Sequence, residues 1–467
     1  MKIHDTGSLI IRPIESSQGD EVRIYVCGAT VYDFSHIGHA RTFIIFDVLR
    51  RYLIQKGVKV LYVQNFTDVD DKILLKAKRM GVDPSDVSKK FIDQYFEDFD
   101  TLNVMRADRY PRATETIAEI ISLIEALLQK NNAYVAENGV YFDVSSFPNY
   151  GQLSKKHLTE LRAGIRVDVD ITKKNPLDFA LWKFSDDDLT WNSPWGKGRP
   201  GWHIECSAMA RKHLGETIDL HGGGEDLIFP HHENEIAQSE SVTGKPLSRV
   251  WMHVGLIEIN AEKMSKSLSN IVPLHESLAR WDANVIRLYV LSSYYRSPMN
   301  YSIENMTKAQ ENWRLVESAG WELQSTIRGD GGCDSILKDV EKLATEFNFA
   351  LEDDMATHRA IGVLMRLARL INRAASKGQL DSHTSKSTKF HFERIMNILG
   401  LRLPQVSEEE RKKIDQLIMK RNRLRGDGKF VEADAIRDSL RDQGFVIVDH
   451  PHQTTWIKLA GPQKKAD

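Results

Sequence analysis

Two short apolar runs on either side of an amphipathic stretch constrain the fold of this chain more than any other feature. The runs "VRIYV" (22–26) and "VKVLYVQNF" (58–66) are rich in β-branched and aromatic residues and are too short for helices. Between them, residues 40–56 carry apolar residues at helical spacing. Strand, helix and strand in this order form a β-α-β unit, which prefers parallel strands and a right-handed crossover. The sequence therefore predicts an α/β fold with a Rossmann-like parallel sheet.

The chain has 467 residues, too many for a single core. We expect a Rossmann-like catalytic domain formed by residues 1–116 and 199–254 and split by an insertion at 117–198, which has a helical pattern over 117–129 and β-rich alternation after it. A linker region at 255–302 is expected next, and then a helical bundle at 303–400. Residues 401–467 read as helix, turn, helix and strand, and form a small C-terminal domain.

Charge and composition exclude several classes of protein. The net charge is −2, so any surface that binds nucleic acid must be a local one. The first residues, "MKIHDTGSLI", lack the apolar segment of a signal peptide, and no apolar run is long enough to cross a bilayer. Three cysteines are too few for a disulfide framework. We therefore expect a cytoplasmic protein that does not associate with membranes.

Two short motifs have the composition of phosphate-binding sites. The first is "HIGH" (36–39), where Gly38 allows close backbone approach and two imidazoles can donate hydrogen bonds to phosphate at a helix N-terminus. The second is "KMSKS" (263–267), where Lys263 and Lys266 could stabilise developing negative charge on a polyphosphate. The alternatives are two ordinary histidines in a turn and a solvated lysine loop.

A possible metal site is spread over the chain. The thiolate, imidazole and carboxylate ligands that zinc accepts are offered by Cys27, Cys206, His231 and Glu235. His231 and Glu235 are four residues apart and share one face of a helix, whose first turn Pro230 would suit. His232 is an alternative ligand, although on a helix it projects about 100° away. The alternative is a pair of buried structural cysteines and a hydrogen-bonded histidine.

The two motifs together are the paired signature of the class I aminoacyl-tRNA synthetases. The segments around them resemble the cysteinyl-tRNA synthetase family: "YVCGATVYDFSHIGHARTF", "NFTDVDDKI", "RPGWHIECSAM", "DLHGGGEDLIFPHHENEIAQSES" and "KMSKSLSN". The resemblance extends from about residue 20 to "GDGKFVEADAIRDSL" (426–440). It implies an enzyme that activates L-cysteine with ATP, releases pyrophosphate, and transfers cysteine to the 3′-terminal adenosine of tRNA(Cys). It also implies a monomer.

The resemblance assigns roles to individual residues. His36, Gly38 and His39 would bind ATP, accompanied by Mg²⁺, while Lys263 and Lys266 would stabilise the departing pyrophosphate. Cys27, Cys206, His231 and Glu235 would bind one zinc ion. Thr67, Trp202, His221 and Asp226 would surround the substrate cysteine, with an aspartate able to pair with its ammonium group and Trp202 forming a wall of the pocket.

Zinc would solve a problem of selectivity, because cysteine and serine differ by one atom and apolar pockets discriminate such pairs by only about 1–3 kcal/mol. A zinc ion selects by coordination chemistry, because it binds the thiol of cysteine as a thiolate and the hydroxyl of serine cannot match this. The short insertion is consistent with the absence of an editing domain. Four protein ligands usually mark a closed structural zinc site. Binding of the substrate sulfur would therefore require a fifth coordination position or the release of one protein ligand. We expect Glu235 to be the ligand that is released.

The C-terminal region has features expected of an RNA-binding surface. Basic residues gather at 420–429, and we expect Arg421, Arg423 and Arg425 to contact tRNA phosphates. Trp456 could stack on an unpaired anticodon base. The alternatives are a solvated helix face for the basic run and a core position for Trp456.

Two other functions remain open at this point. One is a cysteine ligase that forms the same adenylate and transfers cysteine to an amino sugar; such enzymes lack the tRNA-reading region, so residues 401–467 argue against it. The other is a non-catalytic zinc-binding or RNA-binding paralogue, which intact HIGH and KMSKS motifs and a complete ligand set disfavour. Cys333 is given no function.

Overall fold

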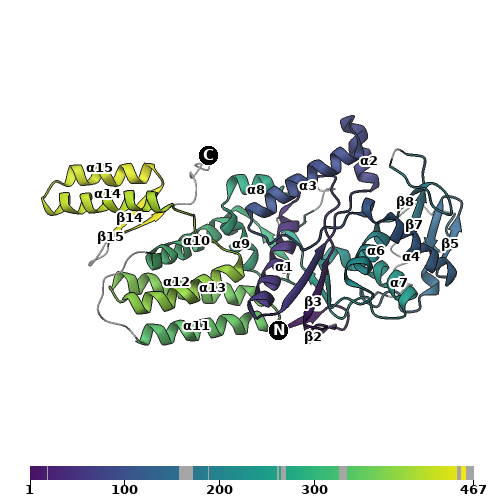
Figure 1. Cartoon of the computed structure of the whole chain (residues 1–467), viewed down its shortest axis with the longest axis horizontal. Helices are drawn as coiled ribbons and strands as arrows, with labels where there is room; N and C mark the ends of the chain where they lie inside the picture. The colour runs from purple at the N-terminus through teal and green to yellow at the C-terminus, as the bar shows by residue number, and fades with distance from the viewer. Residues whose placement is uncertain are drawn as a thin grey trace. The chain divides into compact units, whose positions relative to one another are not determined.

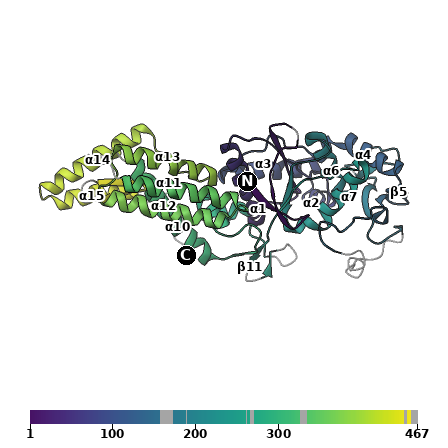
Figure 2. The ribbon, with the colours of Figure 1, turned by 90° about the horizontal axis from the view of Figure 1, so that it is seen from below.

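The computed structural model describes residues 1–17, 19–156, 172–187, 189–259, 262–264, 270–324, 334–449 and 454–458. The chain forms two compact units, which can be followed by colour in Figures 1 and 2. The first holds Met1–His275, Tyr295–Asn300 and Asp353–Met355. The second holds Glu276–Tyr294, Tyr301–Glu352 and Ala356–Asp467.

A four-stranded parallel sheet lies at the centre of the first unit. Its strand order is β10 (Trp251–Val254), β9 (Leu220–Gly224), β3 (Glu21–Val26) and β4 (Lys59–Gln64). Helix α1 (Ile37–Gln55) connects β3 to β4. The predicted α/β fold class and its β-α-β unit are therefore confirmed. Val26 pairs with Gly222, so the segments that follow β3 and β9 leave the sheet at the same edge.

Helix α1 begins at Ile37, three residues before the predicted start at Ala40. His36 is its N-cap: the His36 side chain accepts a hydrogen bond from the backbone N–H of His39, and the His39 side chain accepts one from the backbone N–H of His36. This reciprocal arrangement is a capping box, formed here by two histidines in place of the usual hydroxyl and carboxylate pair. The HIGH motif thus forms the first turn of the helix as well as its cap.

The other elements of the first unit lie around this sheet. Two strands, β1 (Lys2–Asp5) and β2 (Ile10–Pro13), form an antiparallel pair. Helices α2 (Asp71–Met80) and α3 (Pro84–Thr101) follow β4, and α6 (Trp202–Leu214) precedes β9. After β9 come a 3₁₀ turn (Glu225–Leu227), a π-helical turn (Ile228–His232) and helix α7 (Glu233–Thr243). Strands β11 (Ile257–Ile259) and β12 (Glu262–Lys263) form an antiparallel pair after β10.

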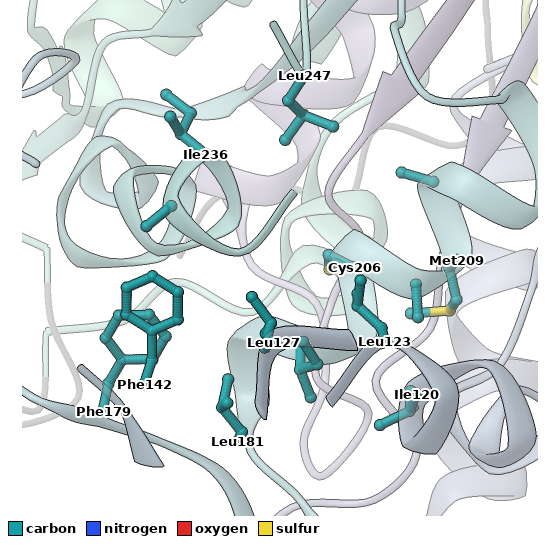
Figure 3. Close-up of a cluster of buried hydrophobic side chains, with 14 of the residues drawn as sticks. Ile120, Leu123, Leu127, Phe142, Phe179, Leu181, Cys206, Met209, Ile236 and Leu247 are labelled. Carbon is teal, nitrogen blue, oxygen red and sulfur yellow. The ribbon is translucent and has the colours of Figure 1, made fainter. Parts of the chain in front are cut away.

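Within the predicted insertion, helix α4 (Ile117–Gln129) coincides with the predicted helix, and a second, antiparallel sheet follows it. This sheet contains β5 (Ala133–Ala136), β6 (Gly139–Phe142), β7 (Phe179–Phe184) and β8 (Gly198–Pro200), with 3₁₀ turns at Ala113–Glu115 and Val144–Ser146 nearby in the chain. Figure 3 shows Leu123 and Leu127 of α4 in the same buried cluster as Cys206 and Met209 of α6. The insertion therefore packs directly behind a helix that carries a predicted metal ligand.

The second unit is helical, as predicted for the region after the sheet. Its elements, with α8 at the boundary of the two units, are α8 (Leu274–Arg280), α9 (Ala283–Leu291), α10 (Ile303–Gln324), α11 (Asp334–Glu352), α12 (Thr357–Ser376) and α13 (Ser382–Leu399), while β13 (Met299–Tyr301) lies between α9 and α10 in the chain. The C-terminal part adds α14 (Glu408–Gly426), α15 (Phe430–Asp442), β14 (Phe445–Asp449) and β15 (Thr454–Lys458). Among the residues described, no helix has the length and apolar character needed to cross a membrane.

The last strand, β15, was not expected from the sequence, where only one strand was predicted after the second tail helix. It pairs antiparallel with β14 over five positions, from Phe445↔Lys458 to Asp449↔Thr454. Both strands pack on α14, α15 and α10 in a small core that contains Trp321 and Trp456. The pairing of β15 thus fixes Trp456 in an interior position.

Candidate active site and metal cluster

A cavity of about 290 Å³ opens where β3, β9 and β10 end at the carboxyl edge of the sheet. Ligand sites in parallel α/β sheets are usually found at this edge. Its lining includes Cys27, His36, His39, Trp202, Asp226 and Met264. These residues come from four separate segments of the sequence, which therefore meet in one cavity within the first unit.

The HIGH residues His36, Gly38 and His39 line this cavity. The rings of His36 and His39 are stacked, with centroids 3.7 Å apart. In each ring Nδ1 accepts a backbone N–H at 3.3 Å, which leaves the ring proton on Nε2 as a donor. A Cβ atom at Gly38 would lie 2.9 Å from His36 Nδ1 and 3.1 Å from Met264 Cε, so a side chain there would crowd the cavity. The pair is suited to binding anionic oxygen beside a helix N-terminus.

The KMSKS segment is described only in part. Lys263 lies on β12, where it pairs with Glu258 of β11. Met264 follows it, lines the cavity, and donates its backbone N–H to the carbonyl of Ile257 at 3.1 Å. Lys266 lies outside the described residues. The structure therefore brings the start of the motif to the same cavity as HIGH.

The four predicted metal ligands are buried together. Their potential ligand atoms, which come from Cys27, Cys206, His231 and Glu235, all lie within 4.8 Å of one another. Cys27 follows β3, Cys206 is in α6, His231 is in the π-helical turn and Glu235 is in α7. Glu235 Oε1 is 3.1 Å from His231 Nε2 and 3.4 Å from Cys27 Sγ. Because Cys27 also lines the cavity, the cluster adjoins the space in which a substrate would sit.

A second set of four residues meets the same criterion: Cys27, His221, His232 and Glu235. The sequence placed His232 about 100° from His231, yet His232 Nε2 lies 3.3 Å from Cys27 Sγ. The two histidines therefore belong to two different sets that share Cys27 and Glu235, with His231 beside Cys206 and His232 beside His221. Residues 228–232 form a π-helical turn in which Phe229 is extended. The sequence suggested that Pro230 lies in the first turn of the helix that carries His231 and Glu235. In the structure Pro230 lies in the π-helical turn that precedes α7.

The chemistry of the cluster fits a soft divalent cation. A hydrogen bond with Cys27 lowers the pKa of the Cys206 thiol to about 7, whereas burial raises the pKa of Cys27 and of Glu235. Burial lowers the pKa of His221 and His232, which keeps both rings neutral. Thiolates and neutral imidazoles are the ligands that zinc prefers. The set with two cysteines is therefore the better zinc site.

Two buried polar atoms also point to a missing partner. Glu235 Oε2 and His221 Nδ1 are fully buried and have no hydrogen-bond partner among the described residues. An unpaired buried carboxylate oxygen is costly unless a cation or donor compensates it. The residues present therefore fit a bound metal ion.

Two histidines beside the cluster were missed by the sequence analysis. His203 Nδ1 lies 2.9 Å from His231 Nδ1, and His253 Nε2 lies 2.8 Å from His232 Nδ1. Partners of this kind fix the orientation of ligating imidazoles. A signal for His203 was present, since it precedes Cys206 by three residues and so shares its helix face. His253 reaches the site only through the pairing of β10 with β9, which the sequence does not specify.

The four residues predicted to surround the substrate cysteine divide into two groups. Trp202 and Asp226 line the cavity, and Trp202, which is 38 % exposed, lies against the His231 ring at 4.4 Å between centroids. Thr67 and His221 are buried and are not among the described residues that line it. Thr67 Oγ1 accepts a hydrogen bond from Asn65 at 3.4 Å, and His221 Nε2 lies 3.6 Å from Cys27 Sγ.

Comparison with known proteins decides the family. A family model described as "tRNA synthetases class I (C) catalytic domain" matches residues 13–311, and a "DALR domain" model matches 346–404. The cysteine–tRNA ligase of Caldicellulosiruptor saccharolyticus is 44% identical over 462 residues, covering 97% of this chain and 99% of the relative. The chain belongs to the cysteine–tRNA ligase family.

Other cysteine–tRNA ligases match to a similar extent. The one from Bacillus licheniformis is 43% identical and covers 98% of both chains. A methionyl-tRNA synthetase from Mycobacterium tuberculosis, solved with methionyl-adenylate, aligns with a TM-score of 0.59 at 15% identity, over 81% of this chain and 89% of that one. This low identity shows a shared class I fold and no more.

The structure corrects two of the tRNA-contact predictions for this family member. Trp456 is only 6 % exposed, its indole N–H donates to Asp415 at 2.9 Å, and its ring packs against Trp321. Arg421 is 2 % exposed and donates two hydrogen bonds of 2.6 Å to Asp449. Both side chains are therefore committed to the interior of the C-terminal region, which was the alternative for Trp456.

The remaining predicted contacts lie at the surface. Arg423 and Arg425 are exposed, and Arg425 also donates to Asp449 at 2.8 Å. Phe430, which no sequence motif singles out, is an aromatic side chain that is 61 % exposed at the start of α15 and follows the exposed Lys429. Sequence alone could not separate the buried Trp456 from the exposed Phe430, because both lie beside basic residues in the chain.

Proposed function

We propose that this protein activates L-cysteine with ATP, releases pyrophosphate, and transfers the cysteinyl group to the 3′-terminal adenosine of tRNA(Cys). The observation that carries the proposal is a single cavity lined by two kinds of group. His36 and His39 are suited to phosphate, and Cys27, which lines the same cavity, belongs to a buried thiol, imidazole and carboxylate cluster. Binding of ATP and a thiol-bearing amino acid in one cavity brings the reacting groups together.

The phosphate-binding residues would act by positioning and charge stabilisation. His36 and His39 would each donate a hydrogen bond from Nε2 to an ATP phosphate. The ATP would bind together with Mg²⁺, its usual companion ion. The cysteine carboxylate would attack the α-phosphorus, and the bond to pyrophosphate would break. Lys263 and Lys266 would stabilise the negative charge of the departing pyrophosphate.

The metal cluster beside the cavity and two of the lining residues would select the amino acid. Cys27, Cys206, His231 and Glu235 would hold one zinc ion, with His203 orienting His231. A zinc ion in this site supplies a strong preference for thiolate sulfur over a hydroxyl group. Trp202 would form a wall of the amino acid pocket, and Asp226 would attract the substrate ammonium. Thr67 and His221 would act from behind the cavity surface, by supporting the residues that line it.

The tRNA is proposed to reach the protein through its C-terminal region. The exposed side chains of Arg423, Arg425 and Lys429 can meet backbone phosphates, and Phe430 can stack on an unpaired base. Transfer to an amino sugar is not favoured, because cysteine–tRNA ligases match almost the whole chain, including this region. A non-catalytic role is not favoured either, because His36 and His39 line one cavity with Cys27, and Cys27 is close to the other three proposed metal ligands.

Cytoplasmic location and a monomeric state complete the proposal. The two described cysteines, Cys27 and Cys206, are free thiols, which agrees with a reducing compartment. A monomer is the species expected in size-exclusion chromatography with light scattering.

The decisive experiment is cysteine-dependent ATP–pyrophosphate exchange, with serine as the control amino acid and with protein before and after removal of zinc by a chelator. Exchange that requires cysteine and is lost with the metal supports both adenylation and metal-based selection. A charging assay then compares tRNA(Cys) with a free amino sugar as acceptor. Folded, zinc-loaded protein without exchange would refute the proposed activity.

A further inference from the structure

The first two turns of α1 are hydrogen-bonded to the chain on both sides of KMSKS. Downstream of the motif, the backbone N–H of Ile37 donates to Val272 at 3.1 Å, and the backbone N–H of Leu274 donates to Ser35 at 2.8 Å. The HIGH residues and residues 272–274 are therefore joined directly by backbone hydrogen bonds. This tether needs no particular side chain.

Upstream of the motif, one side chain makes the connection. Arg41, in the second turn of α1, is 1 % exposed, and its Nη1 donates to the carbonyls of Gly255 and Leu256 at 2.7 Å each. Its Nη2 donates to the carbonyls of Tyr295 at 3.3 Å and Ser297 at 2.5 Å. One guanidinium group thus connects α1 to two separate chain segments through four backbone carbonyls.

Two of these carbonyls, those of Gly255 and Leu256, lie at the base of the hairpin that carries Lys263. Leu256 directly precedes β11, which pairs with β12 through Glu258↔Lys263, and Met264 beyond it reaches the cavity beside Gly38. Gly255 is closely packed, because a Cβ atom there would lie 2.6 Å from the carbonyl oxygen of Arg296. A shift at this base would therefore be passed along β11 to Lys263.

Only arginine has the donors for this arrangement. Its planar fork presents five N–H groups at fixed angles, whereas lysine offers a single ammonium on a flexible stem. We infer that Arg41 is a positioning residue of the activation step, which fixes the Lys263 strand relative to His36 and His39. The inference rests on the proposed function, and it assigns to Arg41 a part in catalysis that does not require contact with substrate.

The same helix supplies a matched control. Arg50 is 5 % exposed, and its guanidinium donates to the carbonyl of Arg106 at 2.6 Å and to Asp108 at 2.7 Å. It is therefore buried and hydrogen-bonded much as Arg41 is, but its partners are not part of the hairpin. Arg41→Lys and Arg50→Lys remove the same guanidinium geometry from two positions of one helix.

The test is steady-state ATP–pyrophosphate exchange by the full chain, with rates normalised to the adenylate formed in a single turnover. Arg41→Lys should lower kcat by about 100-fold, the scale of a misplacement of roughly 1 Å, and leave the KM for cysteine within about twofold. Arg50→Lys should leave kcat within about twofold of wild type. Equal kcat values for the two variants, each carrying stoichiometric zinc, would overturn the inference.

A double-variant comparison separates positioning from general structural damage. If Arg41 acts through the Lys263 strand, the double variant Arg41→Lys, Lys263→Ala should have the same kcat as Lys263→Ala alone. The reason is that the effects of substitutions at coupled residues do not add. Multiplicative losses would refute the coupling. If Arg41→Lys does not fold, Gly255→Ala displaces the same hairpin base and should lower kcat similarly; unchanged kcat in that variant would overturn the inference. Absence of exchange by wild-type protein would instead refute the proposed function.

Discussion

The cavity of the first unit and the C-terminal tail place their predicted functional residues in opposite ways. Segments as far apart in sequence as Cys27 and Met264 meet at the cavity. Six predicted site residues line it, and three more are buried with Cys27 in the adjoining cluster. In the tail, residues adjacent in sequence diverge: Arg421 is buried and paired, while Arg423 is exposed. Sequence motifs therefore predicted the residues of the cavity and metal cluster better than local composition predicted the exposed residues of the tail.

The physical reason lies in what each kind of site requires. A metal cluster or a phosphate-binding helix turn needs particular atoms at particular distances, so the residue types themselves carry the information. An RNA-binding surface needs only exposed cations and aromatic faces. The same residue types also build cores and ion pairs, as Trp456 and Arg421 do here.

The largest effect is expected from the metal cluster. Cys206→Ser should remove bound zinc and lower cysteine-dependent exchange by more than about 100-fold, the upper range seen when only an outer partner of a metal ligand is lost. Metal analysis of purified protein, together with exchange kinetics, checks this. Cys333→Ser is the matched control and should keep zinc and activity. Stoichiometric zinc in Cys206→Ser would show that the other set, with His221 and His232, is the ligand set.

The second effect tests a residue that only the motif identifies. Lys266→Ala should lower the rate of adenylate formation by about 10²–10³-fold, the scale of one pre-organised donor to developing charge. Single-turnover kinetics with saturating ATP and cysteine measure it. Lys308→Ala, an exposed helix lysine paired with Glu304, should leave the rate unchanged. An unchanged rate in Lys266→Ala would remove the proposed clamp on pyrophosphate.

The third comparison separates the two aromatic residues of the tail. Trp456→Ala should destabilise the C-terminal region by about 3–5 kcal/mol, as expected for a buried aromatic residue. Phe430→Ala should change the free energy of unfolding by less than about 0.5 kcal/mol and raise the KM for tRNA about tenfold, since a stacked base contributes roughly 1–3 kcal/mol. Denaturant unfolding and charging kinetics check both. Wild-type charging by Phe430→Ala would exclude that ring from the RNA interface.

The smallest effects concern the arginines. Arg421→Ala should cost about 1–2 kcal/mol at pH 7, because it breaks a bidentate pair whose Asp449 partner is partly exposed. The hydrogen bonds from Arg421 lower the pKa of Asp449 to about 2. A depressed carboxyl pKa stabilises the fold above the unfolded value of about 3.9 and loses that contribution as the pH falls. The stability difference between wild type and Arg421→Ala should therefore shrink between about pH 4 and pH 2.

Arg423→Ala is the surface counterpart. It should leave stability within about 0.5 kcal/mol of wild type and reduce the salt slope of tRNA binding by about one. Binding titrations at several salt concentrations measure this slope. A stability loss equal to that of Arg421→Ala, with an unchanged slope, would show that the two arginines do not differ in role.

The sequence by itself determined the chemistry of this protein. HIGH, KMSKS and the four ligand residues identify the family, because each motif requires specific atoms that few other residue types supply. The alternation of strand and helix patterns also determined the parallel sheet, and helical periodicity the region after it. Each of these signals is local, and a local signal needs no knowledge of distant contacts.

Tertiary structure alone decided which residues face the ligand and which support it. His231 and His232 both have a ring nitrogen close to Cys27, although Cys27 lies about two hundred residues away in the chain. The partnership of His253 with His232 depends on strand pairing, and the burial of Trp456 depends on the pairing of β15 with β14. Arg41 shows the same limit, since its four carbonyl partners lie more than two hundred residues away in the chain. Contacts over such separations are fixed by the packed fold and leave no local pattern in the sequence.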